Sequence, residues 1–232
     1  MKIALLGYGR MGKTIEQIAL KRGHTIVLKI EDGTDYDIKK ADVAIDFSIP
    51  TAAFKNITTC LNNQVPVVSG TTGWLDDYEK AVTLCKQQNG AFIYGSNFSL
   101  GVNIFFELNK QLSKMMKSLD QYKVSMEEIH HLQKLDEPSG TAITLAEGII
   151  ENSSKENWIL GTSDKKEVIG ITALREPDVP GTHSIFYESE VDNITLKHTA
   201  HSRQGFALGA VIAAEWLHDK KGVFTMKDVL GI

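Results

Sequence analysis

Apolar residues between positions 2 and 97 occur in short runs, separated by longer stretches in which they recur every three or four residues. Short runs are typical of buried strands, and the longer spacing is typical of amphipathic helices. The strands predicted in this way are Lys2–Gly7, Thr25–Ile30, Asp42–Phe47, Val65–Ser69 and Ala91–Gly95, and the helices between them are Lys13–Arg22, Thr51–Asn62 and Leu75–Asn89. This alternation predicts an α/β fold with a Rossmann-like parallel sheet.

The pattern changes after Asn97. One long amphipathic stretch, Gly101–Met116, is followed by segments that read as strands. These segments are Gln121–His131, Glu167–Leu174, Thr182–Glu190 and Ile194–His201, and turn residues at Pro177–Gly181 and Asp192–Asn193 predict hairpins among the last three. The sequence therefore predicts a smaller α+β domain with a mostly antiparallel sheet. A final helical pattern over Gly205–His218 and Gly222–Leu230 returns to cover the first sheet.

Composition excludes several classes of function. The 232 residues carry a net charge of −4 with both signs mixed along the chain, so no basic surface favours nucleic acid or a membrane. The apolar run at the N-terminus ends at Gly7, which is too early for a secretion signal or a membrane span. Cys60 and Cys85 lack the spacing of metal ligands and read as reduced thiols. We expect a cytoplasmic protein without a metal site.

The first strand runs into Gly7-Tyr8-Gly9-Arg10-Met11-Gly12, a G-x-G-x-x-G pattern at the start of a helix. Gly7 permits a sharp turn, Gly9 lets the backbone approach a pyrophosphate, and Gly12 lets the helix and strand pack closely. Glu31 follows the second strand, where a carboxylate accepts hydrogen bonds from the ribose hydroxyls of adenosine. The motif predicts dinucleotide binding by a domain made of residues 1–98 and 205–232.

The residue after Glu31 bears on cofactor preference. Asp32 adds a second negative charge where a 2′-phosphate would lie, which favours NADH over NADPH, although Lys29, Lys39 or Lys40 could offset it and dual use stays open. Other strand ends are expected to contact the nicotinamide half, because ligands of such sheets lie beyond the carboxyl ends of the strands. The residues concerned are Gly70, Thr71, Thr72, Gly95, Ser96, Asn97 and Phe98.

A second cluster lies within Glu128–Ala142, where His130, His131 and Lys134 precede a helix start. Ser139 is the expected N-cap, and the amides of Gly140 and Thr141 have no acceptor inside the helix, so a substrate carboxylate could take them. One helix end stabilises a charge by only about 0.3–2 kcal/mol, so Lys134 or a histidine has to contribute. The alternative is a capped helix beside a solvated loop.

The run His130-His131-x-x-Lys134-x-Asp136-x-Pro138-Ser139-Gly140-Thr141-Ala142 resembles the signature of the 4-hydroxy-tetrahydrodipicolinate reductase (dihydrodipicolinate reductase) family. Further motifs match in order along nearly the whole chain: Gly70-Thr71-Thr72-Gly73, Asn97-Phe98-Ser99-x-Gly101-Val102-Asn103, Pro180-Gly181-Thr182 and Arg203-x-x-Phe206-Ala207-x-Gly209-Ala210. The resemblance implies a homotetramer in which a nucleotide domain closes on a substrate domain, and in which NADH or NADPH reduces a small dicarboxylate on the diaminopimelate route to lysine.

Carried over to this sequence, the resemblance implies that His130 is a proton donor and acceptor and that Lys134 is a second proton donor. His131, Ser139, Gly140 and Thr141 would bind the substrate carboxylate, within a substrate-binding and oligomerisation domain at 99–204. The glycine loop is one residue shorter than the common Gly-x-x-Gly-Arg-Met-Gly form. Two alternatives stay open: a different NAD(P)-linked oxidoreductase acting on a small amino-acid-derived acid, and a dinucleotide-binding sensor without catalysis.

Overall fold

The computed structural model describes residues 1–31, 35–202 and 204–232, which form two sheets. The chain divides into two units: Met1–Leu100 with Gln204–Ile232, and Gly101–Arg203. Each unit contains one sheet, with an apolar core on both faces of the first sheet and on one face of the second. Among the described residues, no helix has the length and apolar character needed to span a bilayer.

The first sheet is parallel throughout. Its strands, in order across the sheet, are β11 (Gly222–Phe224), β5 (Ala91–Tyr94), β4 (Val67–Ser69), β3 (Val43–Asp46), β1 (Lys2–Leu6) and β2 (Thr25–Ile30). The predicted α/β class and the five N-terminal strands are confirmed, with shifts of one or two residues at the strand ends.

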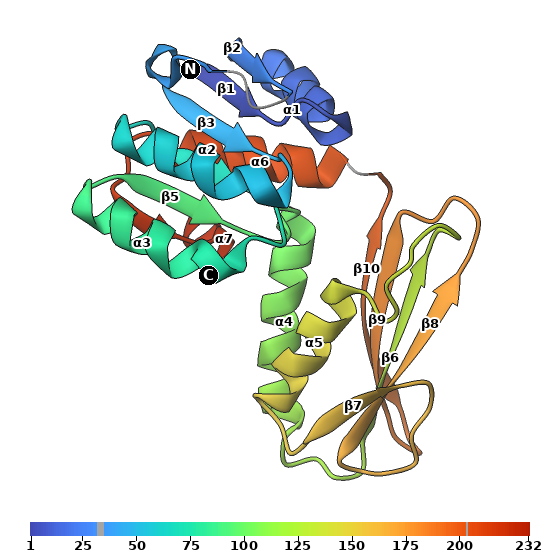
Figure 1. Cartoon of the computed structure of the whole chain (residues 1–232). Helices are drawn as coiled ribbons and strands as arrows, with labels where there is room; N and C mark the ends of the chain where they lie inside the picture. Colours follow the sequence, from blue (N-terminus) through green and yellow to red (C-terminus); the bar gives the residue numbers. More distant parts are fainter. Residues whose placement is uncertain (32–34, 203) are drawn as a thin grey trace. The chain divides into compact units, whose positions relative to one another are not determined.

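Helices cover both faces of this sheet (Figure 1). Ile3 and Leu5 of β1 face one apolar core and Ala4 and Leu6 face the other, because successive side chains of a strand point to opposite sides. The first core contains residues of α1 (Arg10–Lys21) and α6 (Gln204–Leu217), and the second contains residues of α2 (Pro50–Asn62) and α3 (Tyr78–Gln87). Two short 3₁₀ turns, η1 (Ile38–Lys40) and η2 (Leu75–Asp77), complete the connections.

The prediction of a helix over Gly222–Leu230 is wrong in its first half. Gly222–Phe224 forms β11, which pairs with β5, and only α7 (Met226–Leu230) is helical. Thr225 separates the two as the N-cap of α7, in a reciprocal capping box with Asp228. A strand of three residues is too short to show a two-residue period, so its pairing with β5 decided its conformation.

The second sheet is mixed rather than mostly antiparallel. Its order is β10 (Asn193–Ala200), β9 (Gly181–Glu188), β6 (Lys123–His130), β8 (Val168–Arg175) and β7 (Asn157–Leu160). Only the β10–β9 and β9–β6 pairs are antiparallel, whereas β6–β8 and β8–β7 are parallel. The predicted hairpin of β9 and β10 is confirmed. The predicted hairpin of β8 and β9 is wrong, because β6 lies between them, and β7 was not predicted.

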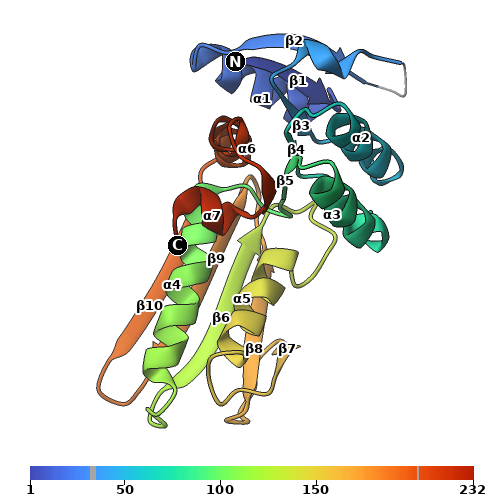
Figure 2. The ribbon, with the colours of Figure 1, turned by 90° about the vertical axis from the view of Figure 1, so that its left-hand side faces the viewer.

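One face of the second sheet is covered by α4 (Leu100–Met116) and α5 (Gly140–Ile150), which lie side by side against it (Figure 2). Val124 and Met126 of β6 and Ile185 of β9 point to this inner face and pack with Leu145 of α5. Because the strand period is two, Glu128 and His130 continue the same face toward the carboxyl end of β6. The fold therefore turns two ionisable side chains of β6 inward.

Candidate active site

The glycine motif occupies the turn from β1 to α1. Gly7 has φ +95°, and a Cβ atom there would lie 2.1 Å from the carbonyl oxygen of Phe47. A Cβ atom on Gly12 would lie 2.3 Å from the carbonyl oxygen of Gly7, whereas one on Gly9 would meet nothing within 4 Å. Gly9 is the N-cap of α1 and has no side chain to satisfy the first helical amides. The turn thus leaves open space and free donors for an anion. Of the remaining motif residues, Tyr8 and Met11 are half-buried and Arg10 is exposed.

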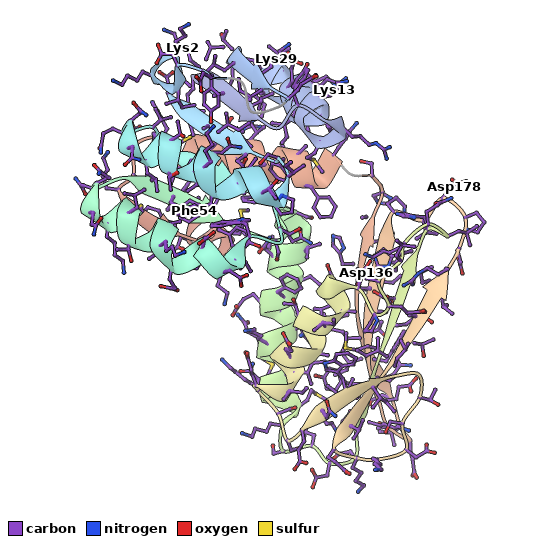
Figure 3. All side chains as sticks on the ribbon, viewed as in Figure 1. Lys2, Lys13, Lys29, Phe54, Asp136 and Asp178 are labelled. Carbon is purple, nitrogen blue, oxygen red and sulfur yellow. The ribbon has the colours of Figure 1, made fainter. Side chains whose placement is uncertain are left out.

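The predicted adenosine end lies after β2. Glu31 is exposed directly after that strand, and Asp32 lies outside the described residues. Lys29 forms an ion pair with Glu16 at 2.6 Å and lies 5.0 Å from the ring centre of Tyr8, whose hydroxyl also donates to Glu16. Figure 3 shows Lys13 and Lys29 in this part of the first unit. Lys29 is therefore already neutralised by a carboxylate of α1.

Asp46, at the end of β3, is fully buried and ties together the ends of two strands. Its carboxylate accepts four side-chain hydrogen bonds: from Ser48 Oγ at 2.7 Å, Asn56 Nδ2 at 2.9 Å, Ser69 Oγ at 2.8 Å and Thr71 Oγ1 at 2.8 Å. Burial raises the pKa of the Asp46 carboxyl, and these four donors oppose the rise. Ser69 ends β4, so one side chain fixes the carboxyl ends of β3 and β4 relative to each other.

The predicted nicotinamide contacts lie just beyond these strand ends. Thr71 is buried and accepts a hydrogen bond from the backbone of Ser48 at 2.8 Å. Gly70 and Gly95 are half-buried beside it, Asn97 is half-buried, and Thr72 and Ser96 are exposed. Phe98 differs from the others because its side chain is only 1% exposed and packs in the core, where its ring centre lies 5.8 Å from that of Phe47. Only the backbone of Phe98 can therefore face a ligand.

In the second unit, strand pairing gathers four polar side chains on the inner face. Glu128 is directly opposite His183 of β9, and His130 is directly opposite Arg175 of β8. Glu128 is fully buried, and His130 and His183 are 6% and 5% exposed. One carboxylate oxygen of Glu128 lies 3.5 Å from His130 Nδ1 and 3.5 Å from His183 Nε2, and the other lies 3.5 Å from Arg175 Nη2.

The start of α5 completes this cluster. Ser139 is the N-cap, as predicted, and its Oγ accepts a hydrogen bond from the backbone of Ala142 at 3.3 Å. The same Oγ lies 3.1 Å from His183 Nε2, and the backbone N–H of Ser139 donates to both oxygens of Glu128 at 3.0 and 3.1 Å. Gly140 is exposed and Thr141 is half-buried. α5 thus begins at a network of buried polar groups, with Gly140 exposed beside it.

Lys134 and His131 lie in the loop after β6. Lys134 Nζ lies 2.5 Å from Asp136 Oδ1, and this hydrogen bond lowers the pKa of the Asp136 carboxyl. Arg175 donates to the carbonyl oxygens of Lys134 at 3.3 Å and Asp136 at 2.7 Å, so it anchors the loop. Figure 3 shows Asp136 beside the start of α5. His131 is half-buried, and its Nδ1 atom is buried without a hydrogen-bond partner among the described residues.

The surroundings lower the pKa values of both His130 and Glu128, for different reasons. Burial lowers the pKa of His130 to about 4, the nearby His183 lowers it too, and Glu128 opposes them. Burial also acts to raise the pKa of Glu128, but hydrogen bonds from His183 and Ser139 outweigh it and lower that pKa to about 2. Although 3.5 Å separates His130 Nδ1 from Glu128, the geometry is not that of a hydrogen bond, and Nδ1 has no such partner in the described ranges. The cluster therefore holds a permanent anion beside a neutral imidazole.

Glu128, His130 and His183 also have the atom types of a metal site, with ligand atoms within 4.8 Å of one another. However, the guanidinium of Arg175 already lies beside the carboxylate, and a backbone N–H binds both of its oxygens. These contacts supply the positive charge and hydrogen bonds that a buried carboxylate needs. The arrangement fits an acid–base site that binds anions better than a cation site.

Sequence reasoning placed Asp46 only at a strand end, and it assigned no role to Asn56, Ser69, Glu128, Arg175 or His183. A usable signal existed for the last two only indirectly. Glu128 falls on the apolar register of β6, two residues beyond Met126, and a carboxylate at such a position requires polar partners from other segments. The identity of those partners depends on which strands lie beside β6.

Comparisons with known proteins agree across the whole chain. The family model described as "Dihydrodipicolinate reductase, N-terminus" matches residues 1–98, and the one described as "Dihydrodipicolinate reductase, C-terminus" matches residues 101–230. A 4-hydroxy-tetrahydrodipicolinate reductase of Christiangramia forsetii is 63% identical, with 99% of this chain and 98% of that protein covered. One from Methanocaldococcus jannaschii is 37% identical, with 98% and 81% covered.

Among solved structures, the chain is similar to a dipicolinate-bound dihydrodipicolinate reductase from Paenisporosarcina sp.. The TM-score is 0.76 at 23% identity, and the match covers 97% of each chain. At this identity the similarity establishes the fold.

Proposed function

This chain belongs to the dihydrodipicolinate reductase family, and from that premise we propose which of its residues bind the nucleotide, bind the substrate and move protons. The protein is a pyridine-nucleotide-dependent reductase that converts 4-hydroxy-tetrahydrodipicolinate to tetrahydrodipicolinate on the diaminopimelate route to lysine. The observation that carries this function is 63% identity to a 4-hydroxy-tetrahydrodipicolinate reductase along 99% of the chain.

The nucleotide is proposed to bind residues 1–98 and 205–232, along the carboxyl ends of the first sheet. The fit is supported by the open space at Gly9, by the uncapped start of α1 and by the polar strand ends around Thr71. When bound, the reduced nicotinamide supplies a hydride. The residues of this chain hold it: the first amides of α1 bind the pyrophosphate, and Glu31 accepts hydrogen bonds from the ribose.

NADH is the proposed preferred form, although NADPH can share the site. In the sequence Asp32 follows Glu31 and adds a second negative charge next to the proposed ribose contact, and Lys29 is already paired with Glu16, so it cannot fully offset this charge. An Asp32→Arg variant is expected to bind NADPH more tightly relative to NADH. Equal titration curves of the variant and the wild type for both nucleotides would place the 2′ site elsewhere.

The substrate is proposed to bind residues 99–204, at the start of α5. Its carboxylates would accept hydrogen bonds from the backbone of Gly140 and Thr141, from Ser139 and from His131, whose buried Nδ1 has no partner in the described structure. An anion in this position is favoured by the helix N-terminus. A dicarboxylate also adds negative charge beside His130, which would raise the pKa of that imidazole and promote its protonation.

Proton transfer is assigned to His130 and Lys134. Hydride addition to a conjugated imine leaves an electron-rich enamine, whose carbon must receive a proton before the product leaves. Lys134, in the loop after β6, would donate this proton. Its Nζ atom lies 2.5 Å from Asp136 Oδ1, so the Asp136 carboxylate orients the ammonium group. His130 exchanges protons within the buried part. A dinucleotide-binding sensor without catalysis would not need either of these proton donors.

We further propose a homotetramer in the cytoplasm. The face of the second sheet opposite α4 and α5 carries Ile129, Phe186 and Leu174, and no helix within the described ranges covers this face (Figure 1). Apolar side chains on an open sheet face are typical of subunit contacts. The two cysteines are free and buried, as expected in a reducing compartment.

The test uses the purified chain with the product of dihydrodipicolinate synthase. NADH oxidation, followed by the absorbance of the reduced nicotinamide, is expected only when that product is present. Turnover of a different amino-acid-derived acid instead would favour another oxidoreductase activity on the same scaffold. Saturable NADH binding without turnover of any substrate would favour the sensor.

A further inference from the structure

The least expected group in the second unit is Glu128. It is a fully buried carboxylate, and a buried charge is costly unless it is paired and hydrogen-bonded. It contacts groups from four segments: its own strand, β8, β9 and the turn into α5. A glutamine of the same size would avoid the cost of burying a charge, so the negative charge needs an explanation in the chemistry of its neighbours.

We propose that Glu128 is a positioning residue of the reductase. Its carboxylate holds the anion-binding first turn of α5 in place and supplies the negative charge beside the proton-donating imidazole of His130. This inference rests on the roles proposed above for His130 and for the α5 N-terminus. The new element is that one side chain, Glu128, contacts both His130 and the N-terminus of α5.

The first half of the argument is the hold on α5. The backbone N–H of Ser139 donates to both carboxylate oxygens, at 3.0 and 3.1 Å. Ser139 is the N-cap, and its Oγ also contacts Ala142 N at 3.3 Å and His183 Nε2 at 3.1 Å. The amides of Gly140 and Thr141 follow immediately in the chain. Any shift of Ser139 therefore moves the donors that would receive the substrate carboxylate.

The second half is the environment of His130. The charged or titratable groups that face its ring are Glu128 on β6, His183 on β9, Arg175 on β8 and Lys134 in the loop. Glu128 is the only anion among these four, and its oxygen lies 3.5 Å from Nδ1. The ring centre of His183 lies 5.0 Å from that of His130, in an edge-on arrangement. Without Glu128, a proton on His130 would face only cations or neutral groups.

Gly181 shows how little freedom the ring has. A Cβ atom built on Gly181 would lie 3.1 Å from His130 Nε2, so β9 confines the ring on the side away from Glu128. Its Nδ1 edge faces the carboxylate and its Nε2 edge faces β9. Glu128 on the strand of His130 and Gly181 on β9 thus flank the two nitrogen atoms of the ring.

The experiment compares Glu128→Gln with Glu156→Gln, a control with the same chemical change at an exposed position just before β7 in the same unit. Glu128→Gln is expected to lower kcat/KM with the synthase product at least about tenfold. The limb on which activity falls as pH rises is expected to move to lower pH by about one unit or more, because the protonated imidazole loses its counter-charge. Glu156→Gln should match the wild type in both, and NADH affinity should be the same in all three proteins.

The histidine titration itself is measured by NMR, without turnover, in the presence and absence of dipicolinate. In the wild type, dipicolinate is expected to raise the pKa of His130, and in Glu128→Gln this rise should be smaller and dipicolinate binding weaker. This readout separates the inference from the proposed function: absent turnover in the wild type would reject the activity, while the NMR titration would still test Glu128.

Glu128→Asp covers the case in which the glutamine variant does not fold. It keeps the charge but draws it back from Ser139, so we expect the pH limb of the wild type together with at least about tenfold weaker dipicolinate binding, because the first turn of α5 loses a charge-assisted hydrogen bond. The inference is overturned if folded Glu128→Gln, or Glu128→Asp in its place, shows the pH profile, kcat/KM and dipicolinate affinity of the wild type within about twofold.

Discussion

Replacement of Asp46 tests whether a buried carboxylate in the first unit orders the nucleotide site. In Asp46→Asn one of the two oxygens becomes an amide nitrogen, which donates and cannot accept. Either Ser69 and Thr71 or Ser48 and Asn56 then face a donor where they had an acceptor. The amide is expected to turn its nitrogen toward Ser69 and Thr71, because a hydroxyl can rotate and accept whereas the amide of Asn56 cannot.

The expected loss in the free energy of unfolding follows from the number of hydrogen bonds that lose an acceptor. A buried polar group left without its partner costs about 1–3 kcal/mol, and the hydroxyl protons of Ser69 and Thr71 lose Oδ2 of residue 46 as their acceptor, although each hydroxyl oxygen can accept from the new amide. Removing a buried charge returns part of its desolvation cost, in line with the raised pKa of Asp46. We therefore expect a net loss of about 1–2 kcal/mol in the free energy of unfolding.

The assays are denaturant unfolding and NADH titration. If about 1.4 kcal/mol of that loss falls on the loops after β3 and β4, NADH binding weakens about tenfold. Dipicolinate binding should not change, because its proposed site lies in the other unit. Asp76→Asn, at an exposed position of the same unit, serves as the control. NADH affinity equal to that of the wild type in Asp46→Asn would show that the network does not order the nucleotide site.

Three further predictions follow from the two sites. Lys134→Ala is expected to lower kcat about 10²–10⁴-fold in steady-state assays, and an unchanged kcat would remove Lys134 from proton transfer. Glu31→Ala is expected to weaken NADH binding by calorimetry while dipicolinate affinity stays the same; equal loss of both would indicate misfolding. Because burial lowers the pKa of His130 from 6.5 to about 4, the unfolded chain binds a proton in that range that the folded chain does not. The free energy of unfolding should therefore fall as the pH decreases from 6.5 to 4, by up to about 3 kcal/mol, and His130→Gln should lose this slope in denaturant titrations. Because the pKa of Glu128 is lowered from 4.5 to about 2, the free energy of unfolding should continue to fall as the pH decreases from 4.5 toward 2. If the free energy of unfolding of His130→Gln depends on pH as steeply as that of the wild type, groups other than His130 cause the dependence.

Local signals in the sequence predicted most of the elements, and the errors have a common cause. The strands β1, β3, β4 and β5 of the parallel sheet are apolar runs that end near glycine or polar residues, and they could be recognised because both of their faces are largely buried. The failures are β7, β11 and the supposed hairpin of β8 and β9. The first two are short strands, and the third depends on a partner, β6, that lies far away in the sequence.

The candidate site divides in the same way. Gly7, Gly12 and Ser139 could be identified from the sequence because their roles are local: a turn, a close approach of helix and strand, and an N-cap. His183 and Arg175 could not, since neither lies near Glu128 in the chain. They reach it through the pairing of β9 and β8 with β6.

The sequence by itself therefore determined the parallel nucleotide-binding sheet, its glycine turn and the capped helix behind a histidine–lysine loop. Those features depend on interactions between residues a few positions apart. Only the tertiary structure decided that two buried carboxylates, Asp46 and Glu128, gather polar partners from several segments, one beyond β3 and one at the start of α5. A two-residue period shows which side chains of one strand share a face, but long-range packing sets which strand lies alongside and in which register.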